Sequence, residues 1–287
     1  MKRFFLCAVM AFFAISVSAQ ELNIASFNLR NNSSADYAKH NGWNERRDIL
    51  SAMINLEAFD VFGTQEGKKI QLEDILQRCP DYAYFGDGRD GGEKGEHCAI
   101  FYRKERIELI EGGTFWLSPT PDSPSKAWEE KVKHWRFVMS ADVKDKKTGV
   151  EFIFMVTHCP LMRSTREKSA KLIIEREKAM NPENKTVIFV GDMNSQPEMP
   201  YSQIIRTHFT DTRDIAEVKS EVAGTMNGAE GVKINQKRTI DHIYIRGNNP
   251  KYKVLTNKVL DNRYKVGDEM LYPSDHCPVE ATIRLTK

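Results

Sequence analysis

The sequence is poor in cysteine, with five in 287 residues, and none of them forms a CxxC pair. It also lacks an HExxH segment, so the usual zinc-binding patterns are absent. There is no internal repeat, heptad pattern or low-complexity tract, which argues against solenoids and long coiled coils. Hydrophobic residues make up 40% and charged residues 29%, a composition typical of a globular protein.

An excess of basic charge is also missing. Lys and Arg number 42 against 40 Asp and Glu, and without Lys2 and Arg3 the two counts are equal. A protein dedicated to long nucleic acids usually carries a basic excess. The balance weakens that class, although a local basic patch stays compatible with it.

Long apolar runs are absent beyond the N-terminus. Residues 1–19 contain two basic residues, an apolar stretch over 4–17 and small residues that end at Ala19. The stretch falls short of the ~18 residues that span a membrane, and Cys7 lies too early in it for a lipid anchor. We therefore predict a signal peptide over 1–19 and an exported protein, periplasmic or extracellular, without a stable membrane anchor. The remaining residues, 20–287, are predicted to form one large domain.

Four cysteines follow the predicted signal peptide. An oxidising compartment permits disulfides, and four cysteines allow three complete pairings, between which the sequence does not choose. Cys159 and Cys277 each directly follow a histidine, which could bring the two thiols close together. We favour isolated thiols for all four, which are Cys79, Cys98, Cys159 and Cys277.

Hydrophobic periodicity predicts more strands than helices. The spacing indicates helices over 44–60, 69–79 and 164–180, the last with Ser164 as a candidate N-cap. Strands are predicted over 21–30, 61–67, 187–190 and 238–247, with paired strands over 97–118 and a hairpin over 134–159 that turns at Lys147 to Gly149. The segment 273–285 is predicted to run from a loop into a last strand. Hairpins mixed with strand–helix units indicate an α+β fold in which two packed sheets are flanked by helices.

Polar side chains recur at the ends of several predicted strands. They are Asn28, Glu66, His158, Asp192, Asn194, Asp241, Asp275 and His276. Each alone is better explained as a turn residue or a satisfied core group. His242 faces the opposite side of its strand from Asp241, and we expect it to be structural.

The recurrence of these side chains has a chemical explanation. Carboxylate and amide oxygens are hard ligands, which suit Mg²⁺, with Mn²⁺ and Ca²⁺ as the alternatives. An Mg²⁺ held by one or two carboxylates usually contacts a substrate phosphate. The set therefore predicts metal-assisted hydrolysis of a phosphate ester.

Six segments in a fixed order carry a resemblance to a known group of enzymes. In sequence order they are FNLR, TQEG, THC, GDMNSQP, IDHIYI and SDHCPV. The set resembles the endonuclease/exonuclease/phosphatase superfamily from Leu22 to Leu285. GRDGGEKGEHCAIFYR and GTFWLSPTPD are similar to an exported bacterial branch of it. The resemblance implies a four-layer α/β/β/α sandwich of two mixed sheets and a catalytic domain over 20–287.

The resemblance also implies metal-binding residues. Glu66 matches the metal-binding glutamate of the TQEG motif. Asn28 and Asp275 match accessory positions that hold or steer the metal. The metal expected there is Mg²⁺.

The catalytic roles follow from the same matches. Asp192 would orient and activate the attacking water, and Asn194 would contact the phosphate. His276 would stabilise the developing charge, and Asp241 would fix the tautomer of its imidazole. His158 would be a second phosphate contact. In-line attack builds negative charge that a metal and fixed donors stabilise.

Substrate contacts are less well defined by the resemblance. Relatives in the exported branch often carry an aspartate and a histidine where this chain has Pro160 and Leu161. Arg166 matches an arginine of that branch and is a candidate phosphate contact, with a solvated helix face as the equal alternative. Arg89, in the Gly-rich loop 86–95, is a further candidate for substrate binding.

Several functions remain open. We rank first a secreted phosphatase or phosphodiesterase that acts, as a monomer, on a small sugar, inositol or nucleotide phosphate. A nuclease is an alternative, and so is a sphingomyelinase-like enzyme whose Phe115, Trp116 and Trp128 would contact a membrane, although core packing explains these aromatics better. A binding protein that kept the fold and lost catalysis ranks last, because Asp192 and His276 are both present.

Overall fold

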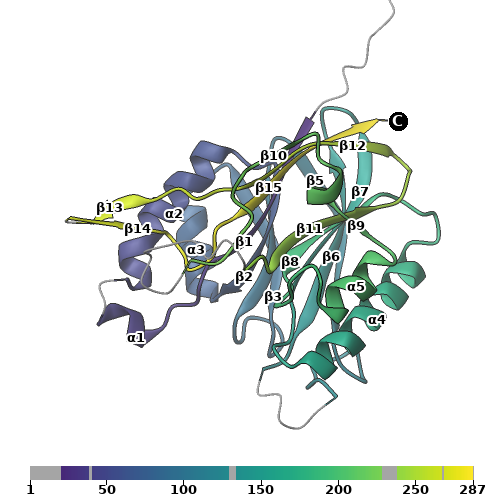
Figure 1. Ribbon diagram of the computed structural model, residues 1–287, viewed down its shortest axis with the longest axis horizontal. Helices are drawn as coiled ribbons and strands as arrows, with labels where there is room; N and C mark the ends of the chain where they lie inside the picture. The colour runs from purple at the N-terminus through teal and green to yellow at the C-terminus, as the bar shows by residue number, and fades with distance from the viewer. Residues whose placement is uncertain (1–20, 39–40, 129–133, 228–237, 267, 287) are drawn as a thin grey trace, which may run out of the picture.

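The computed structural model describes residues 21–38, 41–128, 134–227, 238–266 and 268–286 (Figure 1). The predicted signal peptide, including Cys7, lies outside the described residues and stays a prediction. The helices are α1 Ser34–Tyr37, α2 Trp43–Glu57, α3 Lys69–Arg78, α4 Arg163–Met180, α5 Pro200–Arg206 and α6 Thr212–Ile215.

Two mixed sheets form the centre of the molecule. The seven-stranded sheet has the order β10 (Val218–Lys219), β12 (Lys251–Val259), β15 (Val279–Thr286), β1 (Glu21–Asn28), β2 (Val61–Gly67), β4 (His97–Arg103) and β3 (Tyr82–Gly88). The six-stranded sheet has the order β5 (Ile107–Trp116), β6 (Phe137–Asp145), β7 (Val150–His158), β8 (Val187–Asp192), β11 (Asp241–Arg246) and β9 (Thr210–Asp211). A separate hairpin joins β13 (Tyr264–Val266) to β14 (Glu269–Leu271).

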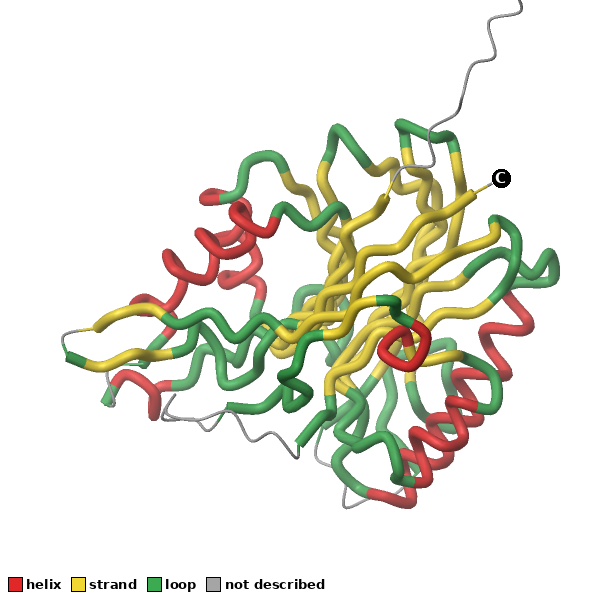
Figure 2. Tube along the Cα trace, turned by 45° about the horizontal axis from the view of Figure 1, so that its top comes forward, coloured by secondary structure: helices red, strands yellow, loops and turns green. Residues whose placement is uncertain are grey.

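The two sheets pack face to face, and helices cover their outer faces. Helices α2 and α3 lie on the seven-stranded sheet, and α4 and α5 lie on the six-stranded sheet (Figures 1 and 2). Strand β8 shows why both faces are buried: Ile188 and Val190 enter the core between the sheets, whereas Val187 and Phe189 pack with α4 and α5. The predicted four-layer α/β/β/α sandwich is confirmed.

Several local predictions require correction. The segment 97–118 contains two strands, but β4 pairs with β2 and β3, whereas β5 pairs with β6 in the other sheet. Alternation in the sequence marks a strand without identifying its partner. Helix α4 begins at Arg163 with Met162 at the N-cap position, so Ser164 lies within the first turn and does not cap it.

Other predictions agree with the structure. The hairpin over 134–159 forms as β6 and β7, which pair antiparallel from Val138↔Thr157 to Asp145↔Val150. All four described cysteines are buried free thiols. Phe115 and Trp116 are buried, as expected for core packing. None of the described helices combines the length and the apolar character needed to cross a membrane.

Gly191 allows strands β7 and β8 to approach closely. It lies opposite Thr157 in the parallel pairing and has a φ of 156°. A Cβ atom at this position would collide with the carbonyl oxygen of Thr157. The glycine thus lets β8 lie against β7 directly before Asp192.

We predict that Gly191→Ala lowers the free energy of unfolding by about 1–3 kcal/mol, because the methyl group overpacks a backbone contact. The measurement is urea denaturation followed by circular dichroism. Gly113→Ala is the matched control, because no atom lies within 4 Å of the Cβ position of Gly113 in β5. Equal effects of the two substitutions would contradict the explanation.

Candidate active site

Three adjacent strands of the six-stranded sheet bring their polar ends into one row. His158 is the last residue of β7 and pairs with Asp192, the last residue of β8. Asp192 in turn pairs with Asp241, the first residue of β11. The register of the sheet therefore places these three side chains on neighbouring strands at the same edge.

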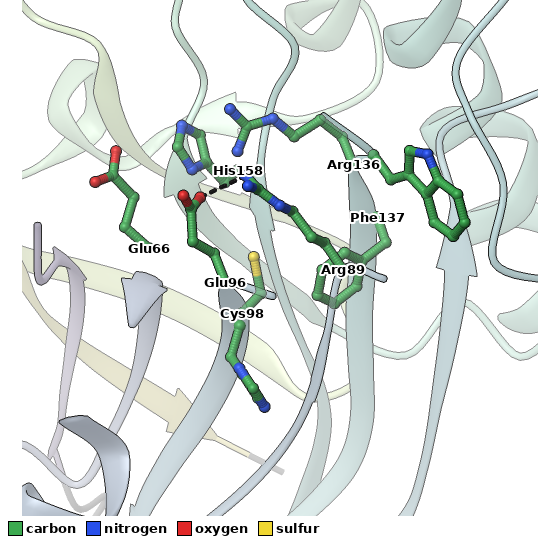
Figure 3. A pocket seen from close by; sticks show the side chains of 9 residues that line it. Glu66, Arg89, Glu96, Cys98, Arg136, Phe137 and His158 are labelled. Atoms are coloured by element: carbon green, nitrogen blue, oxygen red, sulfur yellow. Dashed lines mark hydrogen bonds and ion pairs between the residues drawn. The ribbon is translucent and has the colours of Figure 1, made fainter. Parts of the chain in front are cut away.

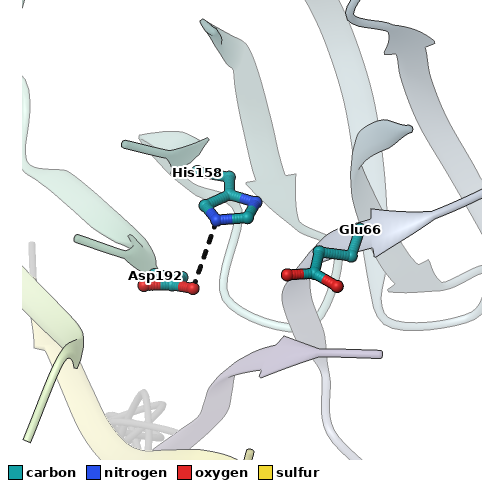
Figure 4. A group of neighbouring side chains, drawn as sticks. All are labelled: Glu66, His158 and Asp192. Carbon is teal, nitrogen blue, oxygen red and sulfur yellow. Dashed lines mark ion pairs between the residues drawn. The ribbon is translucent and has the colours of Figure 1, made fainter. Parts of the chain in front are cut away.

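The other sheet supplies two groups that face this row. Asn28 ends β1, and Glu66 lies in β2 where the pairing with β4 shifts register. The backbone of Glu66 has a φ of 64°, a left-handed conformation that non-glycine residues rarely adopt. Such irregularities in a strand re-aim a side chain, and strained residues cluster at functional sites. Figure 4 shows the Glu66 carboxylate directed toward His158 and Asp192.

The carboxylate of Asp192 lies at the centre of these polar side chains and contacts most of them. Its Oδ2 lies 3.3 Å from Nε2 of His158 and 3.9 Å from Nε2 of His276. The same oxygen accepts a hydrogen bond from Nδ2 of Asn28 at 3.1 Å, and Oδ1 accepts one from the backbone N–H of Asn194 at 2.9 Å. The carboxylate is buried, so its surroundings hold it in one orientation.

His276 and Asp241 form a buried pair. Nδ1 of His276 lies 2.8 Å from Oδ2 of Asp241, which leaves Nε2 directed toward Asp192. Burial alone would lower the pKa of His276, but the charge of Asp241 and its hydrogen bond raise the pKa to about 10. At neutral pH the imidazole is therefore a cation with a fixed orientation, which suits the stabilisation of a phosphate oxygen.

The pKa values of Asp192 and His158 shift in opposite directions. Burial, and then the charge of Asp241, raise the pKa of Asp192 above the ordinary range of a carboxyl. Burial, and then the charge of Arg136, lower the pKa of His158 well below its ordinary value. His158 is thus neutral at pH 7, and Asp192 is a stronger proton acceptor than a solvent-exposed aspartate.

A buried arginine supports the loops that carry the site. The guanidinium of Arg46, from α2, donates hydrogen bonds to the carbonyl oxygens of Asn41, Leu29, Arg30 and Pro273 at 2.8–3.1 Å. It therefore joins the chain that follows β1 to the loop that precedes β15.

A serine fixes the same loop to the end of β1. The hydroxyl of Ser274 donates to the carbonyl oxygen of Asn28 at 2.7 Å. The Ser274–His276 segment is thereby placed beside the end of the seven-stranded sheet.

Asn194 and Asp275, which were also predicted to belong to the site, differ in their position relative to Asp192. The side chain of Asn194 donates to the carbonyl oxygen of Cys159 at 2.9 Å. Asp275 lies 3.7 Å from the guanidinium of Arg30 and outside the cluster around Asp192.

The two arginines that were predicted to bind substrate lie in different places. Arg89 lines a pocket together with Glu66 and His158. Arg166 lies in α4 and does not line this pocket, so its predicted role as a phosphate contact stays a prediction.

The chemistry of the cluster fits a divalent cation. Ligand atoms of Glu66, His158 and Asp192 lie within 4.8 Å of one another, and so do those of Asp192, Asp241 and His276. No ion pair joins Glu66 to another residue in the described part of the chain. Its Oε1 accepts from Asn28 and its Oε2 from the backbone N–H of Asn31, and each oxygen keeps a second lone pair for a cation. Asn28 presents its amide nitrogen to Glu66 and Asp192, because its oxygen accepts from the N–H of Arg30. Asn28 thus orients the candidate ligands here.

The two-sheet sandwich with carboxylates, histidines and amides gathered at its strand ends defines a hydrolase of the phosphoesterase type. The chain belongs to the Endonuclease/Exonuclease/phosphatase family, whose family model matches residues 25–276. The resemblance drawn from the motifs is therefore confirmed. Members of this family act on phosphoesters and generally depend on a divalent metal.

Solved structures of other proteins share the fold over most of the chain. An endonuclease/exonuclease/phosphatase family protein from Bacteroides thetaiotaomicron is 35% identical, with a TM-score of 0.87 and coverage of 92% of this chain and 98% of that one. A mannosyl-6-phosphatase from Bacteroides thetaiotaomicron is 36% identical, with a TM-score of 0.85 and coverage of 93% and 100%. D. rerio TDP2, complexed with a single-strand DNA product, is 19% identical, with a TM-score of 0.72 and coverage of 92% and 99%, which shows the fold alone.

The sequence patterns did not identify several residues of the site. Arg30, Arg46 and Ser274 hold the loops, and Glu96 and Arg136 line the pocket beside Glu66. The available signal for Arg136 was a lone arginine directly before an apolar strand. Nothing local to such an arginine shows which distant residues it faces.

We predict that Asp241→Asn lowers the pKa of His276, because the charge that raises it is removed while burial remains. The measurement is an NMR titration of the imidazole C2–H in metal-free protein. The raised pKa of the wild type contributes stability that is fully present below ~6.5 and is lost as the pH rises through about 10. The Tm of the wild type should therefore fall between these values, and that of the variant should fall less.

The control for this titration is Asp142→Asn, which removes a partly exposed carboxylate paired with Lys185. It should leave the titration of His276 unchanged. A titration of His276 that is the same in Asp241→Asn and the wild type would show that Asp241 does not set its protonation.

Proposed function

We propose that the protein is a Mg²⁺-dependent phosphoester hydrolase that acts on a small phosphorylated molecule, with a phosphorylated sugar as the first candidate. The observation that carries the proposal is the position of the buried Asp192 carboxylate, within 3.9 Å of two imidazoles and beside Glu66. The 36% identity to a mannosyl-6-phosphatase supports the choice of a sugar phosphate. The equal numbers of acidic and basic residues beyond residue 19 favour a small substrate over long nucleic acid.

The mechanism assigns separate tasks to the residues of the cluster. Glu66, with Asp192 or His158, would hold the cation, which when bound polarises the phosphate and offsets its charge. Asp192 accepts the proton of the attacking water, whose oxygen forms a bond to phosphorus as the bond to the leaving alcohol oxygen breaks. The leaving oxygen takes a proton from solvent.

Fixed donors stabilise the charge that develops during this attack. The His276 cation, oriented by Asp241, donates to a phosphate oxygen through Nε2. The side-chain amide of Asn194 donates one N–H to the carbonyl oxygen of Cys159, and its second N–H would be the donor to the phosphate. Removing one such donor typically costs about 10²–10³ in rate. Because these groups are held before substrate arrives, little reorganisation is needed in the transition state.

We predict that the purified protein hydrolyses mannose 6-phosphate in Mg²⁺ and loses this activity in EDTA. Inositol phosphate, nucleotide, single-stranded DNA and sphingomyelin are assayed beside it by release of phosphate or of the diester product. Asp192→Asn should lower kcat by about 10²–10⁴, because it removes the proton acceptor.

Asp214→Asn is the control for this assay, because Asp214 is an exposed residue of α6 that pairs with Arg206. It should retain wild-type activity. An absence of turnover on every substrate in the presence of Mg²⁺, or full activity of Asp192→Asn, would refute the proposed function.

A further inference from the structure

A pocket adjoins the cluster on the side of Glu66 and His158. It is narrow, with room for about one water molecule, and it opens to solvent. Figure 3 shows the side chains that line it, among them the guanidinium groups of Arg89 and Arg136, on the same side as the imidazole of His158. Two cationic groups therefore lie next to the atoms that would handle a phosphate.

Arg136 makes no direct ion pair within the described residues, although the charges of Glu96 and Asp192 act on it from a longer distance. Only 7% of the residue is exposed, and no hydrogen bond or ion pair joins its guanidinium to another described residue. Glu96, the other carboxylate of the pocket, is already engaged: Oε2 accepts from Arg89 at 2.6 Å, and Oε1 accepts from Asn31 at 3.3 Å. The guanidinium of Arg136 is thus left without a direct carboxylate partner among the described residues.

Other polar atoms of the pocket are also without partners in the described part of the chain. Nδ1 of His158 and Nε of Arg89 are buried and make no hydrogen bond there. A buried guanidinium is costly unless an anion pairs with it. Groups without partners that converge on one pocket beside a reaction centre indicate a place for a charged ligand.

We propose that Arg136 is a specificity-determining residue that binds the terminal phosphate of a monoester and makes the enzyme a phosphomonoesterase. This inference rests on the proposed function and decides between monoester and diester substrates. A monoester presents three non-bridging oxygens and carries nearly two negative charges at pH 7. A guanidinium binds two such oxygens in parallel.

A phosphodiester fits this arrangement less well. It carries one negative charge, and a second ester group takes the place of one non-bridging oxygen. The electrostatic gain from the Arg136 charge is therefore smaller for a diester. Arg136 consequently contributes more to monoester hydrolysis than to diester hydrolysis.

The test compares two ester classes on the same chromophore. Values of kcat/KM are measured for para-nitrophenyl phosphate and bis-para-nitrophenyl phosphate in Mg²⁺, for the wild type, Arg136→Met and Arg136→Lys. We expect Arg136→Met to lose about 10- to 100-fold on the monoester and to change little on the diester. Arg136→Lys, which keeps the charge but not the two parallel donors, should lose less. Equal losses on both esters, or no loss on the monoester, would overturn the proposal.

Arg163→Met is the matched control, because Arg163 is an exposed arginine of α4 that pairs with Glu167. It should leave both rates unchanged. If Arg136→Met does not fold, the ratio of monoester to diester loss in Arg136→Lys decides by the same criterion.

A second readout does not depend on turnover. Removing an unpaired buried charge should raise the Tm of Arg136→Met without ligand, whereas a fall would assign the guanidinium to the fold and contradict the proposal. Inorganic phosphate with Mg²⁺ should raise the Tm of the wild type but not that of Arg136→Met. If the wild type hydrolyses neither these esters nor any substrate of the preceding assay, the proposed function fails, and this phosphate-induced shift alone decides whether Arg136 binds the anion. An absent shift in the wild type, or an equal shift in the variant, would overturn the inference.

Discussion

The amide of Asn28 donates hydrogen bonds to two carboxylates that come from different sheets. It reaches Glu66 at 3.2 Å within the seven-stranded sheet and Asp192 at 3.1 Å across to the six-stranded sheet. Two like charges at the junction of the sheets are unfavourable unless donors or a cation offset them. The rest of the site follows from this constraint, because Asn28 and His276 each place a donor nitrogen near the carboxylates.

Residues with strained backbone and buried charged side chains lie at the same junction, and both features generally lower the stability of a protein. Glu66 and Asn194 have φ values of 64° and 48°, and Asp192, Asp241 and Arg136 are buried charged groups. Backbone strain and desolvated charges are each destabilising. The apolar core between the sheets and the two helical layers supply the stability that lets the strand ends keep these features. The fold therefore provides a rigid frame for a polar centre that would not be stable by itself.

The sequence predicted the candidate site better than the pairing of the strands. Asp192, Asp241 and His158 were predictable because each directly ends or begins an apolar run, and the ends of neighbouring strands meet. The segment β3, YAYFGDG, was missed because its glycines and aspartate are typical of a loop. The partners of β4 and β5 depend on packing at long range, and so does the pocket around Arg136. A pattern within one short segment of the sequence does not indicate such long-range contacts.

The central claim is that Glu66 and Asp192 together form a divalent-metal centre at the junction of the sheets. Anomalous diffraction from crystals soaked in Mn²⁺ tests it most directly, because the ion is located without reference to any substrate. The account predicts an anomalous peak about 2–2.5 Å from a Glu66 oxygen, on the side that faces Asp192, which disappears in Glu66→Gln. A peak elsewhere, no peak at this junction, or an undiminished peak in Glu66→Gln would contradict it.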